Sequence, residues 1–162
     1  MPVYDLAFAR KFAEVAEDTV AGGLDDVEAH RVVAYISRLS MELSLKAFLE
    51  RVGVPVAEIK RHWHDLRRLL AEVEACEVEI EISPGEKRWL PASRVRSVEV
   101  GLPGHQVTLG WILEAEDHGA SQYPNELRYG GMPKDFPAAA LARAAVVLAE
   151  WVAEHWNAAR RP

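Results

Sequence analysis

The sequence predicts a mainly α protein, an antiparallel helical bundle with a small antiparallel β insertion at about residues 77–111. Three observations support this prediction. Apolar residues recur at steps of three and four in four long segments, as they do in amphipathic helices. The segment after Cys76 instead alternates with period two, as a strand does. The 162 residues contain no repeat, low-complexity tract or linker, so residues 1–162 are expected to form one domain.

The first half of the chain predicts two helices separated by a glycine pair. The first covers about residues 3–20, and Gly22-Gly23 ends it because glycine readily adopts the left-handed conformation found after helices. Asp25 or Asp26 is expected to cap the second helix by accepting its unpaired amide hydrogens. This second helix should continue to about residue 52, where a Gly-Val-Pro break follows.

A third helix is expected at about residues 56–75, and a last one at about residues 138–156. In the third helix, five apolar residues recur at steps of four, three, four and three and form one seam: Ile59, Trp63, Leu66, Leu70 and Val73. Because only a short connection separates the second and third helices, they are expected to be antiparallel neighbours. The many alanines of the last helix allow a partner helix to approach closely.

The β insertion is predicted from alternation and turn residues. Residues 77–82 alternate between glutamate and an aliphatic residue and end at Ser83-Pro84-Gly85, the pattern of a strand followed by a turn. Residues 94–100 and 106–111 are further strand candidates, separated by glycine and proline.

Charge, cysteine content and hydropathy limit the class of protein. The formal net charge of -6 argues against a general polyanion binder, because nucleic-acid affinity depends on neutralising phosphates, but it allows a local basic patch. The single cysteine, Cys76, cannot form an internal disulfide, and the first residues show no secretion signal. The longest apolar stretch, residues 138–153, is too short and too charged to span a bilayer. A cytoplasmic protein is therefore expected.

Glu42 and Lys46 are the first candidates for a functional site. They lie four residues apart, in the order that favours an ion pair on a helix. One interpretation is a surface pair worth a few tenths of a kcal/mol, roughly the usual value for such pairs. The other is that Glu42, beside Leu43 at the edge of the apolar face, orients a histidine or arginine from the next helix.

His62, His64 and Asp65 raise the question of a metal site. Residues two apart on a helix lie about 200° apart around its axis, so His62 and His64 are not expected to bind one ion. A zinc pair needs a spacing of three or four, and the chain has no such pair of histidines. Neither a metal nor another cofactor is therefore expected.

Basic residues surround His64 in the same predicted helix. Lys60, Arg67 and Arg68 lie within one turn of it and form a local basic stripe, which suits a phosphate or an acidic partner. The alternative is a solvated face whose long side chains cover the apolar seam.

Arg128 and Tyr129 lie in a loop rich in tyrosine, proline and glycine, residues 123–131. Tyrosines on both sides of an arginine can stack on a base or hold the guanidinium over an aromatic ring. Alternatively, the tyrosines anchor the loop to the helices and Arg128 bonds to Glu42 or Asp65.

These segments together resemble the HEPN domain, a small helical module of prokaryotic toxin, nucleotidyltransferase-associated and defence systems. The resemblance covers residues 27–70 and, more loosely, 123–156. Its signatures are Glu42-x-x-x-Lys46, His64-Asp65-Leu66 at the start of a helix, and Leu127-Arg128-Tyr129 before the last helix. It implies an antiparallel helical bundle and a nucleotidyltransferase or an antitoxin as partner. A homodimer is expected because helical modules of this size with several tryptophans often leave one apolar face to share.

The sequence departs from the catalytic pattern of this family. Ribonucleases of the HEPN family carry an arginine followed, after four to six residues, by a histidine, and this pair cuts RNA without metal at a dimer interface. No arginine of this chain has a histidine at that distance: Arg61 precedes His64 too closely, and residues 133–135 after Arg128 include no histidine.

Three functions remain open from the sequence. The first is a HEPN-like module that binds a nucleotide or RNA in a stress, toxin–antitoxin or defence system, with Glu42, His64 and Arg128 meeting in one cleft. Lys46 and Arg68 are expected near its rim. The second is a metal-independent endoribonuclease in which His64 acts as general acid or base and Arg128 stabilises the phosphorane. The third is a structural adaptor whose polar groups only satisfy one another.

Overall fold

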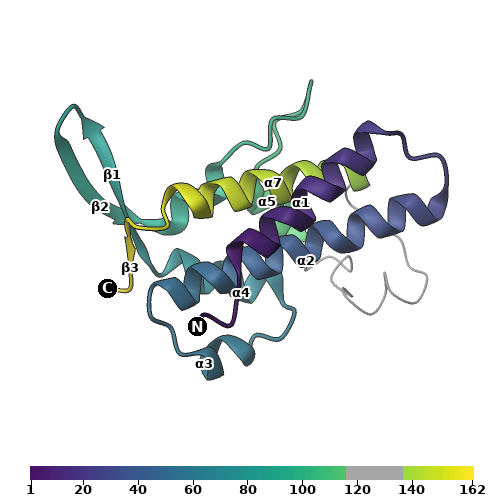
Figure 1. Cartoon of the computed structure of the whole chain (residues 1–162). Helices are drawn as coiled ribbons and strands as arrows, with labels where there is room; N and C mark the ends of the chain where they lie inside the picture. The colour runs from purple at the N-terminus through teal and green to yellow at the C-terminus, as the bar shows by residue number, and fades with distance from the viewer. Residues whose placement is uncertain (116–136) are drawn as a thin grey trace.

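A computed structural model describes residues 1–115 and 137–162 of the chain. The protein is mainly α with a small three-stranded antiparallel sheet, which confirms the predicted fold class. The helices are α1 (Leu6–Ala21), α2 (Val27–Arg51), α3 (Val56–Lys60), α4 (Leu66–Glu74), the 3-10 helix η1 (Ala92–Ser97), α5 (Leu109–Glu114) and α7 (Ala138–Glu154). The strands are β1 (Glu77–Ser83), β2 (Glu86–Pro91) and β3 (Ala159–Arg160), as Figure 1 shows.

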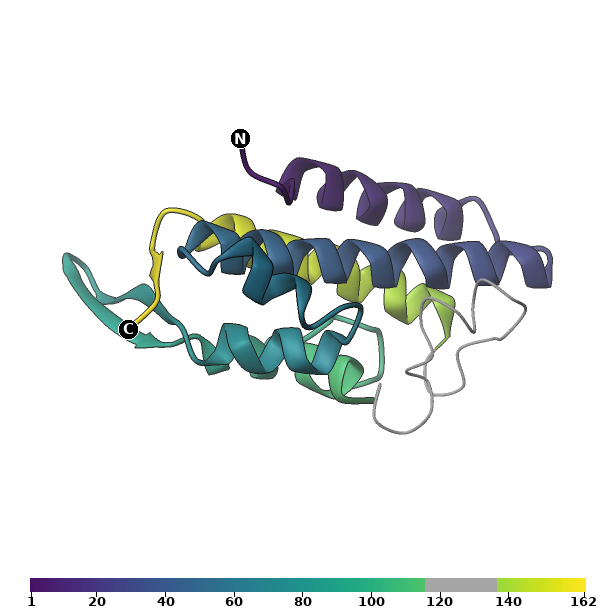
Figure 2. The same cartoon turned by 90° about the horizontal axis from the view of Figure 1, so that it is seen from below.

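The helices pack on both sides of α2 and α7. Figure 2 shows α1 on one side of this pair and α4 with α5 on the other. α1 runs opposite to α2, whereas α7 runs in the same direction as α2. The buried face of α1 consists of Ala9, Ala13 and Ala16. Such small side chains let the backbones approach closely, and the Ser40 hydroxyl of α2 donates to the Ala9 carbonyl at 2.7 Å.

The helix α2 begins and ends close to the predicted limits. Asp26 is its N-cap, since Asp26 Oδ1 accepts a hydrogen bond from the Ala29 amide at 2.7 Å. Its 25 residues give a length of about 37 Å, so the helix extends through most of the molecule. Arg38, Glu42 and Lys46 are among its buried residues, which means that α2 carries charged groups into the interior.

The prediction of one continuous helix at residues 56–75 is wrong. The segment is divided into α3 and α4 by a turn over residues 61–65, and Asp65 caps α4 by accepting from the Arg68 amide at 3.0 Å. Of the predicted apolar seam, Trp63 is 75% exposed and has a φ of 51°, whereas the other four residues are buried. Apolar periodicity continues across the turn because both short helices pack on the same core, so spacing alone does not reveal the break.

The turn also changes the direction of the chain. His64, just before α4, lies beside Glu42 in the middle of α2. The other end of α4 leads into β1, which pairs with β3 at the end of the molecule where Arg51 Nε donates to the Trp156 carbonyl. α4 therefore runs in the same direction as α2, and the expected antiparallel pairing is wrong for this helix.

The sheet confirms one predicted strand and corrects two others. β1 pairs with β2 in a hairpin and with the two residues of β3 on its other edge. Residues 94–100, predicted as a strand, instead begin within η1, and residues 106–111 lead into α5, whose N-cap is Thr108. A single bridge between Glu99 and Thr108 is the only strand-like pairing that these two described segments make with each other.

The approach of η1 to α5 gives the physical reason for this correction. A Cβ on Gly110 would lie 2.9 Å from the Arg96 carbonyl oxygen, so only glycine permits this contact. Arg96 also forms ion pairs with Glu74 of α4 and Glu114 of α5. No helix in the described part of the chain combines the length and apolar character needed to cross a bilayer.

Candidate functional site

Glu42 is the centre of a compact polar cluster. Its side chain is 3% exposed, and its Oε1 accepts a hydrogen bond from Lys46 Nζ at 2.6 Å. His64 Nδ1 lies 3.0 Å from both carboxylate oxygens. The structure thus brings together two of the three residues of the predicted triad, Glu42 and His64. We call Glu42, Lys46 and His64 the Glu42 cluster.

Local structure on both sides holds the Glu42 cluster in place. Glu42 and Lys46 are one turn apart on α2, which aligns their side chains along one face. His64 ends the turn before α4, and its position is defined by the Asp65 cap and by Leu66, which is fully buried. The cluster therefore connects α2 to the start of α4.

Burial of the ion pair excludes the interpretation as a surface pair. Lys46 is only 6% exposed, and its Nζ lies 5.5 Å from the centre of the Tyr4 ring, within cation–π range. Lys46 is expected near the rim of a cleft shared with Arg128; in the described part of the chain it is buried, with the Tyr4 ring beside its ammonium group. Glu50 holds the N-terminal segment over Lys46: its Oε1 and Oε2 accept from the amides of Val3 and Tyr4, each at 2.8 Å.

The carboxylates around Tyr4 influence its hydroxyl. Burial raises the pKa of Tyr4, and the negative charges of Glu42 and Glu50 raise it further. Tyr4 therefore remains a neutral phenol at physiological pH and contributes a hydroxyl rather than a charge to the surroundings of Lys46.

The contact between Glu42 and His64 determines what the imidazole can do. A carboxylate accepts, so we assign the proton on this side to His64 Nδ1, which makes Nε2 the basic nitrogen of the neutral ring. The carboxylate also stabilises the charged imidazolium. The His64 side chain is 47% exposed, so the ring reaches solvent. It can exchange a proton with a ligand or donate a charge-assisted hydrogen bond to an anion.

The basic residues near His64 come from two helices, α3 and α4, and not from one. Lys60 ends α3 and is exposed, while Arg67 and Arg68 are exposed in the first turn of α4. Arg68 Nε lies 3.3 Å from Asp65 Oδ2, so part of its charge is balanced locally. The predicted stripe is therefore a group of cations on both sides of the turn at residues 61–65.

The two histidines of the turn have different partners. His62 Nε2 lies 3.8 Å from Glu72 Oε1, whereas His64 contacts Glu42. Within residues 1–115 and 137–162, no group of three or more histidine, cysteine, aspartate or glutamate side chains is arranged to hold a metal ion. Residues 61–65 form a turn and not a helix, so the expected placement of His62 and His64 around one helix axis is wrong.

Two predicted site residues, Arg128 and Tyr129, lie outside the described residues. Their convergence with Glu42 and His64 remains a prediction.

Sequence reasoning missed three residues near the Glu42 cluster: Tyr4, Arg38 and Trp63. Arg38 is 1% exposed and lies one turn before Glu42 on α2. The spacing of four in Arg38-x-x-x-Glu42-x-x-x-Lys46 is a signal that could have found Arg38, because it places three charges on one helix face. No local pattern indicates Tyr4, which is distant in sequence from Glu42.

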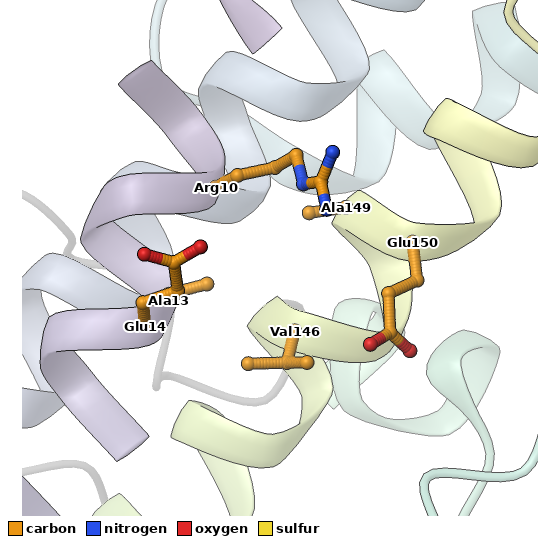
Figure 3. Close-up of a pocket in the computed structure, with 6 residues that line it drawn as sticks. All are labelled: Arg10, Ala13, Glu14, Val146, Ala149 and Glu150. Atoms are coloured by element: carbon orange, nitrogen blue, oxygen red, sulfur yellow. The ribbon is translucent and has the colours of Figure 1, made fainter. Parts of the chain in front are cut away.

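A small pocket lies elsewhere, between α1 and α7. It has a volume of about 60 Å³ and is lined by Arg10, Ala13, Glu14, Val146, Ala149 and Glu150 (Figure 3). This space admits water but is too small for a nucleotide. It includes no predicted site residue.

Comparison of the chain with protein-family models, with curated proteins and with solved structures gives no match.

Proposed function

We propose that this protein is a HEPN-like module that binds the phosphate of a nucleotide or RNA at the Glu42 cluster. In this proposal, binding regulates a partner, such as a nucleotidyltransferase or an antitoxin, in a prokaryotic stress or defence system. The observation that supports it most is the contact of His64 Nδ1 with both oxygens of the buried Glu42 carboxylate. An imidazole oriented in this way and half exposed is a better ligand group than a solvated histidine, because its orientation is already set.

The charges around His64 favour an anionic ligand. Glu42 balances Lys46, so a protonated His64 adds a positive charge that the surrounding Lys60, Arg67 and Arg68 reinforce. Phosphate oxygens accept charge-assisted hydrogen bonds from such groups. The net charge of -6 fits a small, localised anion site better than a long nucleic-acid track.

Calorimetric titration with nucleotides and with short single-stranded RNA tests this function. His64→Ala should weaken binding at least about tenfold, the effect of losing one charge-assisted hydrogen bond of about 1.5–3 kcal/mol. His105→Ala is the matched control, since His105 is exposed and belongs to the segment between η1 and α5. Binding with equal affinity in both variants would contradict the proposed site. No heat with any ligand would instead favour the structural adaptor.

A second candidate function, a metal-independent endoribonuclease, is favoured by the same orientation of His64. A ring whose Nδ1 faces a carboxylate presents a basic Nε2, as a general base that removes the proton from a 2′-hydroxyl requires. The proposal keeps Arg128 as the group that stabilises the developing phosphorane charge. Incubation with RNA in EDTA distinguishes the candidates: cleavage abolished by His64→Ala would favour the enzyme, and intact RNA with retained binding would favour the binding module.

A further inference from the structure

The residue before His64 has an unusual backbone and an unusual environment. Trp63 is 75% exposed, and it is the only non-glycine residue with a positive φ, 51°, in the part of the chain that the structure describes. Its amide donates to the Lys60 carbonyl at 3.1 Å, and the Asp65 amide donates to the His62 carbonyl at 3.0 Å. These hydrogen bonds close the turn on both sides and hold the Trp63 backbone in the left-handed region.

The backbone conformation of Trp63 and the exposure of its ring both disfavour folding. Bulky side chains rarely adopt the left-handed conformation, because Cβ approaches the following carbonyl oxygen, and glycine is the usual residue there. A large apolar ring in water also gives up the stabilisation that burial would provide. Backbone strain of this kind is concentrated at active sites and ligand-binding sites.

We propose that Trp63 is a stacking platform for the base of the ligand whose phosphate binds at His64. This inference rests on the proposed function and narrows the ligand to one that carries a nucleobase. Consecutive Cα atoms are about 3.8 Å apart, so the ring and the imidazole start from neighbouring points of the same turn. The flanking cations Lys60, Arg67 and Arg68 complete the combination of an aromatic face with positive charge that single-stranded nucleic acids require.

Trp111 provides a matched comparison within the same protein. It is also a well exposed tryptophan, at 60%, but it lies in α5, three residues before the acidic Glu114. Its backbone is helical, and the nearby Arg96 is engaged in ion pairs with Glu74 and Glu114. Exposure alone therefore does not distinguish Trp63; its strained backbone and its place between cations do.

The test compares adenosine monophosphate with ribose 5-phosphate, which lacks the base, by calorimetry and tryptophan fluorescence. The wild-type protein should bind the nucleotide about 5- to 100-fold more tightly, the range that stacking on an aromatic side chain gives. Trp63→Ala should abolish this preference and keep the affinity for ribose 5-phosphate. Trp111→Ala should change neither affinity.

The outcomes separate this inference from the function on which it rests. Equal binding of both compounds by the wild-type protein, or a preference that survives in Trp63→Ala, would overturn the stacking role while leaving the phosphate site intact. Binding of neither compound would overturn both. Trp63→Gly gives a second readout: we expect a higher melting temperature together with loss of the preference for the base, whereas a purely structural tryptophan would lower the melting temperature when removed.

Discussion

Two ion pairs of this protein are similar in sequence and opposite in environment. Lys11 and Glu14 on α1 are three residues apart, 3.1 Å from each other, and both are more than half exposed. Glu42 and Lys46 on α2 are four residues apart, 2.6 Å from each other, and both are buried. The difference shows that spacing identifies a pair, whereas the surrounding elements determine what the pair does.

The two ion pairs differ in environment because α1 lies on the outside of the bundle, whereas other helices cover α2 on several sides (Figure 2). Water and salt screen the charges of the α1 pair, so its contribution to stability is small. The α2 pair lies under Tyr4 and beside His64, where a charge without its partner is costly. Only the α2 pair can therefore orient a catalytic or binding group.

Removing the carboxylate from each ion pair should give the largest difference in stability between two variants. Glu42→Ala leaves the Lys46 ammonium buried without its partner, and we expect a loss of about 3–5 kcal/mol in the free energy of unfolding. Glu14→Ala should change it by less than about 0.5 kcal/mol. Urea denaturation followed by circular dichroism measures both. Similar values for the two variants would mean that Lys46 is as hydrated as Lys11.

His64→Ala should have an intermediate effect on stability. It removes one hydrogen bond from a half-exposed ring but leaves Glu42 paired with Lys46, so the expected loss is about 1 kcal/mol. Urea denaturation of this variant beside Glu42→Ala would show it. A loss as large as that of Glu42→Ala would assign His64 a structural role and weaken the proposed binding function.

The sequence predicted α1, α2 and α7 well because their ends depend on local chemistry. Asp26 caps α2 as predicted, and the glycine pair at residues 22–23 follows α1. β1 was also predicted, since strict alternation over six residues is a strong signal. Its partner β2 lacks such alternation, and β3 has only two residues, so their pairing depends on tertiary contacts.

The candidate site was predicted only in part. Glu42 and His64 do meet, but the helix on which His64 was placed is broken there. The burial of Lys46 depends on Tyr4, which reaches it only after folding and is not encoded by any nearby pattern. Trp63 shows most clearly what spacing cannot predict. It continues the apolar period of a helix but is exposed to solvent, because the same period also fits two helices separated by a turn.

Trp63 and Glu42 form a second comparison: Trp63 is an exposed apolar residue, whereas Glu42 is a buried charged one. Replacing Trp63 with glycine tests how the exposed tryptophan affects stability. Trp63→Gly should raise the free energy of unfolding by about 1 kcal/mol, since glycine adopts a φ of 51° without steric strain and little burial is lost. Trp111→Gly, in the first turn of α5, should lower it by up to about 1 kcal/mol. Thermal unfolding of both variants gives the comparison. Destabilisation by Trp63→Gly would show that the tryptophan packs against something that stabilises the turn.

Cys76 extends the comparison to a buried titratable group whose pKa shift comes mainly from burial, and it should give the smallest effect. Burial raises the pKa of the Cys76 thiol to about 11, although Arg161 partly opposes the shift. The ordinary value is 9.0, so between about pH 9 and pH 11 the unfolded chain loses this proton while the folded protein keeps it. Stability should therefore fall as pH rises through this window, and Cys76→Ala should reduce the slope. At pH 8 the folded protein should react with a thiol reagent far more slowly than the denatured chain, because only thiolate reacts and Cys76 is 3% exposed. Equal reaction rates in the folded and denatured protein would show that the thiol is exposed. Cys76 would then not be comparable to the buried Glu42 carboxylate.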